Sequence, residues 1–360
     1  MVKDSNTINI NNLSTIETLD EFYKLTQPTA SLAASLSDTL YGISHTDGTK
    51  VMPQSKTHQG YVFFTRPQLN MKSVNLRNLR WTYNLLDTNP NSLHRYVRNT
   101  LDPRLSALYN IHSSLVDNEN GFIPLLTNTV KTVSGWPDIV LPTYTSSAGV
   151  RGEQHVIGDG TTDIFQAYDI DVTFKNIQDD PTLILFQTWI FYIAAVFEGI
   201  FVPYMDLRLA NEIDYNTRIY RLVMDETQTR VKQISATGAS FPISVPTGKV
   251  FDFTDDSVYD KNNKEINIRF KTVGAMYNDS ILIHQFNRTS GMFDPNVKAL
   301  LKAGCKESPT HPLVKIPSEL ANALNNRGHP IIDPVTYELS YWISKESETY
   351  KTVKQKLKGV

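Results

Sequence analysis

Apolar and polar side chains alternate along residues 168–175, so that tyrosine, isoleucine, valine and phenylalanine share one face of an extended chain. This two-residue period predicts a half-buried antiparallel strand. Two further strands are predicted at Arg218–Asp225 and Arg230–Ser235, because a loop of hairpin length joins them. Ile266–Lys271 alternates in the same way, and Phe241–Gly248 is expected to be extended and stiffened by proline. The middle of the chain is therefore predicted to be an antiparallel sheet.

Among these strands lies the stretch Pro181–Phe197, which is apolar at nearly every position and carries no charge before Glu198. Asp180 can cap the free N–H groups of a helix start, Pro181 suits the first helical position, and Gly199 offers the left-handed residue that ends a helix. No cluster of lysine or arginine flanks this stretch, so membrane insertion is not expected. The pattern predicts a helix buried between the sheet and a neighbour, which can be another subunit.

A capping side chain stands before a proline at five places, and a proline in the first turn of a helix has no N–H to lose. The pairs are Asn89-Pro90, Asp102-Pro103, Asp180-Pro181, Asp294-Pro295 and Asp333-Pro334. Beyond the central helix, we predict helices within residues 76–115, at Pro295–Ala303, at Ser318–Arg327 and at Pro334–Leu357. The last of these is expected to face inward with the apolar residues Val335, Leu339, Trp342 and Ile343.

Composition suggests four parts: an N-terminal arm (residues 1–57), a mixed strand and helical insert (58–148), a β-rich core (149–290) and a C-terminal helical region (291–360). Residues 121–145 are expected to be loops and short strands. The fold class is α+β, with an antiparallel β-barrel or sandwich, one buried helix, the helical insert and C-terminal helices. The arm is polar with spaced apolar anchors, so we expect it to order on another subunit. Its anchors are Leu13, Ile16, Leu19, Phe22, Tyr23, Leu25, Leu32 and Leu40.

The chain has 360 residues, a formal net charge of −2 and one cysteine. A near-neutral chain is not expected to hold nucleic acid through its phosphates, and we predict no sequence-specific nucleic-acid binding. The single cysteine, Cys305, rules out an internal disulfide and fits assembly in a reducing cytoplasm. Residues 1–14 lack the apolar segment of a signal peptide.

Candidate chemistry is sparse along the sequence. Oxygen ligands for a calcium ion gather in one acidic loop, at Asp252, Asp255, Asp256, Asp260 and Asn262. The glycine and final glutamate of an EF-hand loop are missing there, so we expect a solvated loop, with a bound ion as the alternative. No histidine or cysteine pair has zinc-binding spacing, Ser240 lacks the flanking glycines of a nucleophile turn, and His155 and His284 are expected to be structural. The sequence predicts no catalytic, cofactor-binding or metal-ligating residue.

One enzyme hypothesis competes with a structural role. Asp169 and Asp171 share a strand face and could pair as carboxylates, with Glu198 as a third acid. Paired carboxylates are the acid and base of carbohydrate-active enzymes. Two acids on a solvent face are more often simply solvated, so the structural role is favoured.

The order of elements resembles the tail-tube proteins and tube-like baseplate proteins of contractile-tailed bacteriophages. The matching segments are the strand Ile170–Phe174, the helix Pro181–Glu198, Val202–Met205, Asn211–Tyr215, the strand pair around Ile219–Asp225, the step Gly238–Pro242, Ile243–Pro246 and the strand Ile266–Phe270. Arg66–Asn70 also resembles a stretch of virion structural proteins of large phages. Together these segments cover about a third of the chain.

The resemblance implies a structural virion protein of a phage tail that assembles through sheet and helix interfaces in the host cytoplasm. Its partners would be copies of itself in a ring and other tail or baseplate proteins. The arm, the helical insert and the C-terminal helices favour a baseplate or tube-initiating protein over the repeated tube subunit. A capsid or neck protein is the alternative within virions, and a soluble carbohydrate-active enzyme is the alternative outside them.

Overall fold

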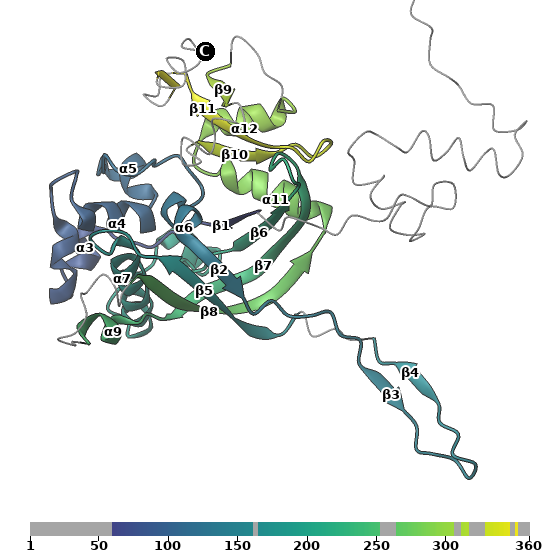
Figure 1. Ribbon diagram of the computed structural model, residues 1–360. Coiled ribbons are helices and arrows are strands. Elements are labelled where there is room, and N and C mark those ends of the chain that lie inside the picture. The colour runs from purple at the N-terminus through teal and green to yellow at the C-terminus, as the bar shows by residue number, and fades with distance from the viewer. Residues whose placement is uncertain are drawn as a thin grey trace, which may run out of the picture. The chain divides into compact units, whose positions relative to one another are not determined.

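Six antiparallel strands form a large curled sheet, a half-barrel, in the order β1-β6-β7-β8-β5-β2 (Figure 1). Each strand pairs antiparallel with its neighbours. Their bounds are β1 Gly60–Phe64, β2 Val130–Ser134, β5 Ala167–Lys175, β6 Ile219–Met224, β7 Val231–Ser244 and β8 Glu265–Tyr277. The mixed helix and strand content and the antiparallel sheet agree with the predicted α+β class.

The structure is a computed structural model that describes residues 60–160, 165–252, 264–305, 311–316, 328–345 and 350–351. The chain divides into two units, residues 1–58 and 59–360. All described residues belong to the second unit. The N-terminal arm, the acidic loop beyond Asp252 and the helix predicted at Ser318–Arg327 lie outside the described residues, and these three stay predictions.

The predicted alternation along residues 168–175 is confirmed in β5. Ile170, Val172 and Phe174 are buried on one face, and the helix α7, Pro181–Phe197, covers that face. Phe186 of α7 lies between two strands, with its ring centroid 5.5 Å from that of Phe174 and 5.6 Å from that of Phe270 in β8. The bounds of α7, Pro181–Phe197, are those that its apolar run predicts.

The two ends of α7 differ in how well the sequence predicts them. Asp180 has a left-handed backbone (φ 51°) and makes no capping hydrogen bond, because its carboxylate accepts from the Asn176 side chain instead. Gly199 ends the helix as predicted, with φ 76°. The Ile200 N–H donates to the Ala195 carbonyl (2.9 Å) and the Gly199 N–H to that of Val196 (3.1 Å). This pair of bonds is a Schellman motif, which satisfies carbonyls that the helix end leaves free.

Short helices that precede α7 in the chain contribute side chains to the same core, and α4 packs directly against α7. The helices before α7 are α3 Ser73–Leu76, η2 Arg80–Leu86, α4 Leu93–Leu101, α5 Arg104–Tyr109 and α6 Pro124–Thr129. Three more are α8 Met205–Leu209, α9 Thr247–Phe251 and α12 Pro295–Lys302. α12 has almost the predicted bounds, and Gly304 follows it with a left-handed φ of 74°.

A second hydrophobic core lies on the opposite face of the sheet, over β1, β6 and β7. Phe286 of α11, Ser280–Ser290, has its ring centroid 5.1 Å from Phe63 and 5.4 Å from Tyr220. A three-stranded sheet of order β10-β11-β9 adds side chains to the same core. Its strands are β9 Leu313–Ile316, β10 His329–Ile332 and β11 Leu339–Ser344.

The helix predicted at Pro334–Leu357 is wrong over residues 334–345, because the chain turns there and continues as β11, which forms a hairpin with β10. Tyr350 and Lys351, the other described residues of this range, are helical. Val335, expected to face inward, lies in the turn and is 83% exposed. Leu339, Tyr341 and Ile343 face the core under α11, whereas Trp342 packs with residues of α12. A strand buried on both faces gives a continuous apolar run, which periodicity cannot separate from a buried helix.

The five pairs of a capping residue and a proline lie at turns, and only some of these turns begin a helix. Asp294 caps α12 by accepting from the Asn296 N–H (2.7 Å), and Asp102 accepts from the Arg104 N–H (3.1 Å) where α5 begins. Asp333 makes the same bond to Val335 (2.8 Å), but the chain reverses into β11. Asn89 likewise makes a local turn, and α4 begins later, at Leu93. A side-chain oxygen that accepts from the backbone N–H two residues later therefore occurs both at helix starts and in turns.

The strand predicted at Arg230–Ser235 and the first half of the extended segment predicted at Phe241–Gly248 belong to one strand, β7, which ends at Ser244. The extended prediction is wrong at Thr247 and Gly248, which begin the helix α9. Pro242 lies where the register between β7 and β8 shifts, which is a position where a strand tolerates the missing N–H of proline. The predicted hairpin between β6 and β7 is confirmed, since Tyr220 pairs with Ala236 and Met224 with Val231.

Candidate functional site

A two-stranded hairpin connects β2 to β5 and extends from the end of the large sheet (Figure 1). Its strands are β3 Thr143–Thr145 and β4 Val156–Gly158, with Thr143 opposite Gly158 and Thr145 opposite Val156. Every residue from 138 to 160 is exposed except Pro142 and Ser146, which are half-buried. The hairpin therefore buries almost nothing against the described part of its own chain.

Apolar side chains are concentrated on this hairpin. Seven of them have half or more of their surface exposed, namely Ile139, Val140, Leu141, Tyr144, Val150, Val156 and Ile157. A lone two-stranded hairpin is marginally stable in water, and a contiguous exposed apolar surface marks an interaction site. The sequence predicts only loops and short strands up to residue 145, although the apolar runs at 139–141 and 156–157 were a signal that could have been read.

The carboxylates of the enzyme hypothesis do not converge. Asp169 forms an ion pair with Lys271 (2.8 Å), and Asp171 forms one with Arg269 (2.9 Å). In both pairs the two residues lie opposite each other on β5 and β8. Asp171 raises the pKa of the Arg269 guanidinium through that hydrogen bond and its charge. Glu198 is exposed at the C-terminal end of α7. Cross-strand pairs of this kind stabilise a sheet and leave no free carboxylate pair.

A buried network of acids and tyrosines ties the loops around α7 together. The Tyr204 hydroxyl donates to Asp102 (2.8 Å), and the Tyr192 hydroxyl donates to Asp214. Burial raises the pKa of Asp102 to about 6, although hydrogen bonds from the Met71 N–H and from Tyr204 oppose that rise. Burial also raises the pKa of Asp214. These side chains are buried and hydrogen-bonded, which suits a structural network.

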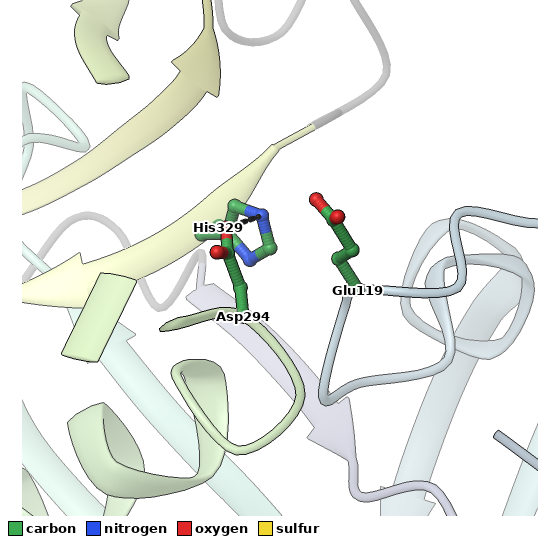
Figure 2. A group of neighbouring side chains, drawn as sticks. All are labelled: Glu119, Asp294 and His329. Atoms are coloured by element: carbon green, nitrogen blue, oxygen red, sulfur yellow. Dashed lines mark ion pairs between the residues drawn. The ribbon is translucent and has the colours of Figure 1, made fainter. Parts of the chain in front are cut away.

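The described histidines range from exposed to half-buried, and His329 is buried beside two acids. His155 is exposed on the hairpin and His284 is exposed on α11, so neither is a buried structural imidazole. His329 lies beside Asp294 and Glu119 (Figure 2). Burial and the charges of Asp294 and Asp117 raise the pKa of Glu119. No spacing motif predicts this cluster, because its three residues come from distant parts of the chain.

The single cysteine does not lie in an environment that activates a thiol. Cys305 is half-buried, and burial raises the pKa of its thiol, which disfavours the reactive thiolate. None of the helices in the described part of the chain has the length and hydropathy to span a bilayer.

Comparison with solved structures finds partial likenesses to injection-system proteins. The tube-terminating cap of the anti-feeding prophage is 14% identical, with a TM-score of 0.27, over 44% of this chain and 81% of the cap chain. A chain of the sheath–tube complex of the extracellular contractile injection system PVC, in the extended state, is 16% identical, with a TM-score of 0.27, over 44% and 82%. A chain of the PVC sheath/tube terminator, also in the extended state, is 14% identical, with a TM-score of 0.25, over 44% and 87%.

Among curated proteins, none matches this chain. The family described as "Putative phage tail tube protein" matches residues 3–358, which is nearly the whole sequence. The chain therefore belongs to this phage tail tube family and is a structural component of a phage tail.

Proposed function

We propose that this protein is a ring-forming tail subunit in a tube, tube-initiating or baseplate position, and that it binds copies of itself and neighbouring tail proteins. The observation that carries the proposal is the exposed apolar hairpin at residues 138–160. An isolated hairpin with seven exposed large apolar side chains is expected to dock on another protein surface, because its own chain gives it no cover among the described residues.

The large sheet supplies a second surface for assembly. Among the described strands, β1 and β2 are its edges, and β2 pairs only with β5. Edge strands present free N–H and C=O groups, which closure of a barrel removes. We propose that neighbouring subunits complete the half-barrel to a β-barrel, the tube-like core that the sequence suggests.

The uncovered face of β5 and β8 suits the wall of a channel for DNA. Three carboxylates of this face form ion pairs, namely Asp169 with Lys271, Asp171 with Arg269, and Glu265 with Lys131 of β2. Basic side chains held in ion pairs are less available to phosphates, so DNA would pass with little binding. We therefore expect neither catalysis nor sequence-specific nucleic-acid binding at this face.

Two further segments are proposed to reach other subunits. Phe197 of α7 is 93% exposed and Phe191 is 41% exposed, so the predicted contact between this helix and a neighbour involves its C-terminal half. The arm over residues 1–57, which lies outside the described residues, is proposed to order on an adjacent subunit. The four-part division of the chain remains part of this proposal, but its last part, residues 291–360, contains the sheet β10-β11-β9 as well as the helix α12.

Imaging and a paired set of variants test the proposal. Purified full-length protein is expected to form rings or tubes in negative-stain images. Val156→Ser with Ile157→Ser should abolish them and leave monomers with an unchanged melting temperature. The matched control, Ile281→Ser with Val335→Ser, removes two exposed apolar side chains outside the hairpin and should assemble normally. A wild-type protein that stays monomeric at high concentration, alone and with other tail proteins, would contradict the proposal.

A further inference from the structure

We propose that Glu119, Asp294 and His329 form a binding site for one divalent transition-metal ion of the zinc type. Each residue offers one ligand atom, and these atoms lie within 4.8 Å of one another. Figure 2 shows the Glu119 carboxylate facing the imidazole of His329, and a dashed line marks the ion pair between His329 and Asp294. The site goes beyond the proposed assembly function, which does not require a metal.

Two of the ligands are already placed at the spacing that zinc requires. The distance from Asp294 Oδ2 to His329 Nε2 is 3.3 Å. In a tetrahedral zinc site with bonds of about 2.0–2.1 Å, neighbouring ligand atoms are about 3.4 Å apart. Glu119 closes the remaining gap by moving about 1.4 Å or less, since no ligand separation exceeds 4.8 Å. Its side chain is exposed and free to make that movement.

One buried oxygen of the cluster, Asp294 Oδ2, points independently to a missing ligand. Asp294 and His329 have side chains only 1% and 6% exposed. Asp294 Oδ2 and His329 Nδ1 have no hydrogen-bond partner among the described residues. The other Asp294 oxygen, Oδ1, is occupied, because it accepts from the Asn296 N–H at the start of α12. Its contact with His329 Nε2 at 3.3 Å is an ion pair only when the imidazole is protonated, so a cation bound between the two atoms would satisfy this buried carboxylate oxygen.

Hydrogen bonds hold the loop that carries Glu119 and tie it to the chain next to His329. Arg66, itself buried, donates to the carbonyls of Asp117, Asn118 and Asn120, which fixes the loop that carries Glu119. The Asn120 side chain donates to the Gly328 carbonyl (3.4 Å), so this loop is tied to the start of β10 next to His329. Ligands on a fixed backbone lose little freedom on binding, which favours affinity.

The donor set selects the class of ion. One imidazole and two carboxylates suit zinc and related transition metals, whereas calcium and magnesium prefer oxygen ligands alone. Two carboxylates and a neutral imidazole also balance the charge of a divalent ion. Three protein ligands leave a fourth position for water on the exposed side of Glu119. The ion would join the loop before Phe122 to α12 and β10, and so link distant parts of the chain.

Metal analysis of tag-free, full-length protein tests the site. After treatment with a chelator and incubation with zinc chloride, the desalted wild-type protein should retain about one zinc ion per chain and melt at a higher temperature than the metal-free protein. Glu119→Gln should weaken zinc binding by about tenfold or more and leave the melting temperature of the metal-free protein unchanged. Cobalt in place of zinc should give a visible absorption band that His329→Gln removes.

Matched variants separate this site from incidental zinc binding. Glu226→Gln and His284→Gln change an exposed glutamate and an exposed histidine elsewhere and should bind zinc like the wild type. If the wild type retains no zinc, or if Glu119→Gln binds it as tightly as the wild type, the three residues form only a buried ion pair with a nearby acid and the proposal is wrong. Because Glu119 is exposed, its variant keeps the test decisive even if His329→Gln does not fold.

Discussion

The helix α7 and the β3–β4 hairpin are both built from apolar side chains, but their surroundings are opposite. Leu185, Phe186 and Trp189 of α7 have no exposed surface, whereas Val156 and Ile157 of the hairpin are half or more exposed. The helix has the curled sheet on one side and α4 on the other. Among the described residues, the hairpin is covered only by its own two short strands. Apolar content therefore shows that a segment needs cover, and the fold decides whether its own chain provides it.

This difference separates stability from assembly. Burial of apolar area is the main favourable term in folding, so residues of α7 are expected to hold the fold together. Exposed hairpin residues contribute little to folding of one chain and are expected to contribute to binding between chains. Substitutions in the two regions should change different measured quantities.

The largest expected effect comes from emptying the core under α7. Phe186→Ala removes a ring packed between Phe174 and Phe270 and should lower the free energy of unfolding by about 3–5 kcal/mol, measured by urea denaturation. Phe197→Ala in the same helix is the control, because Phe197 is exposed and its loss should cost less than about 0.5 kcal/mol. Equal losses from the two variants would contradict the assignment of the buried face.

A smaller, pH-dependent effect is expected from Asp102, which follows the helix α4 that covers α7. Its folded pKa of about 6 lies above its ordinary value of 3.8, because burial disfavours the charged form. Its contribution to stability is therefore fully present below about pH 4 and is lost as the pH rises through 6. Since one pKa unit corresponds to about 1.4 kcal/mol, the loss is at most about 3 kcal/mol.

Asp102→Asn tests this sign, because the variant cannot titrate. Urea denaturation between pH 4.5 and 7.5 should show a smaller fall in stability with rising pH than in the wild type, whatever the absolute stability of the variant. Asp159→Asn, on the exposed hairpin, should keep the wild-type slope. An unchanged slope for Asp102→Asn would mean that Asp102 titrates at its ordinary value in the folded protein.

The smallest expected effect on stability is in the hairpin itself. Val156→Ser with Ile157→Ser should change the free energy of unfolding of the monomer by less than about 0.5 kcal/mol, because these side chains have little packing to lose. The measurement is urea denaturation at a protein concentration below that of assembly. A loss comparable to that of Phe186→Ala would mean that the hairpin packs on its own chain, and the comparison with α7 would fail.

Local signals in the sequence determined the elements that depend on neighbouring residues. The alternation of β5 and the bounds of α7 follow from the period of their apolar positions and from Pro181 and Gly199 at the helix ends. The β6–β7 hairpin and α12 follow from similar signals. The α+β class could also be predicted.

The tertiary structure decided the features that depend on distant residues. Leu339–Ile343 became a strand because two packed layers cover both of its faces, and a continuous apolar run fits helix and strand equally. Asp333 opens a turn and Asp294 opens a helix with the same local hydrogen bond, so the packing of the next segment selects between them. Sequence alone could not show that Glu119, Asp294 and His329 meet, or that α7 is covered and the hairpin is not. Each of these outcomes is set by packing between segments far apart in the chain, which local patterns do not encode.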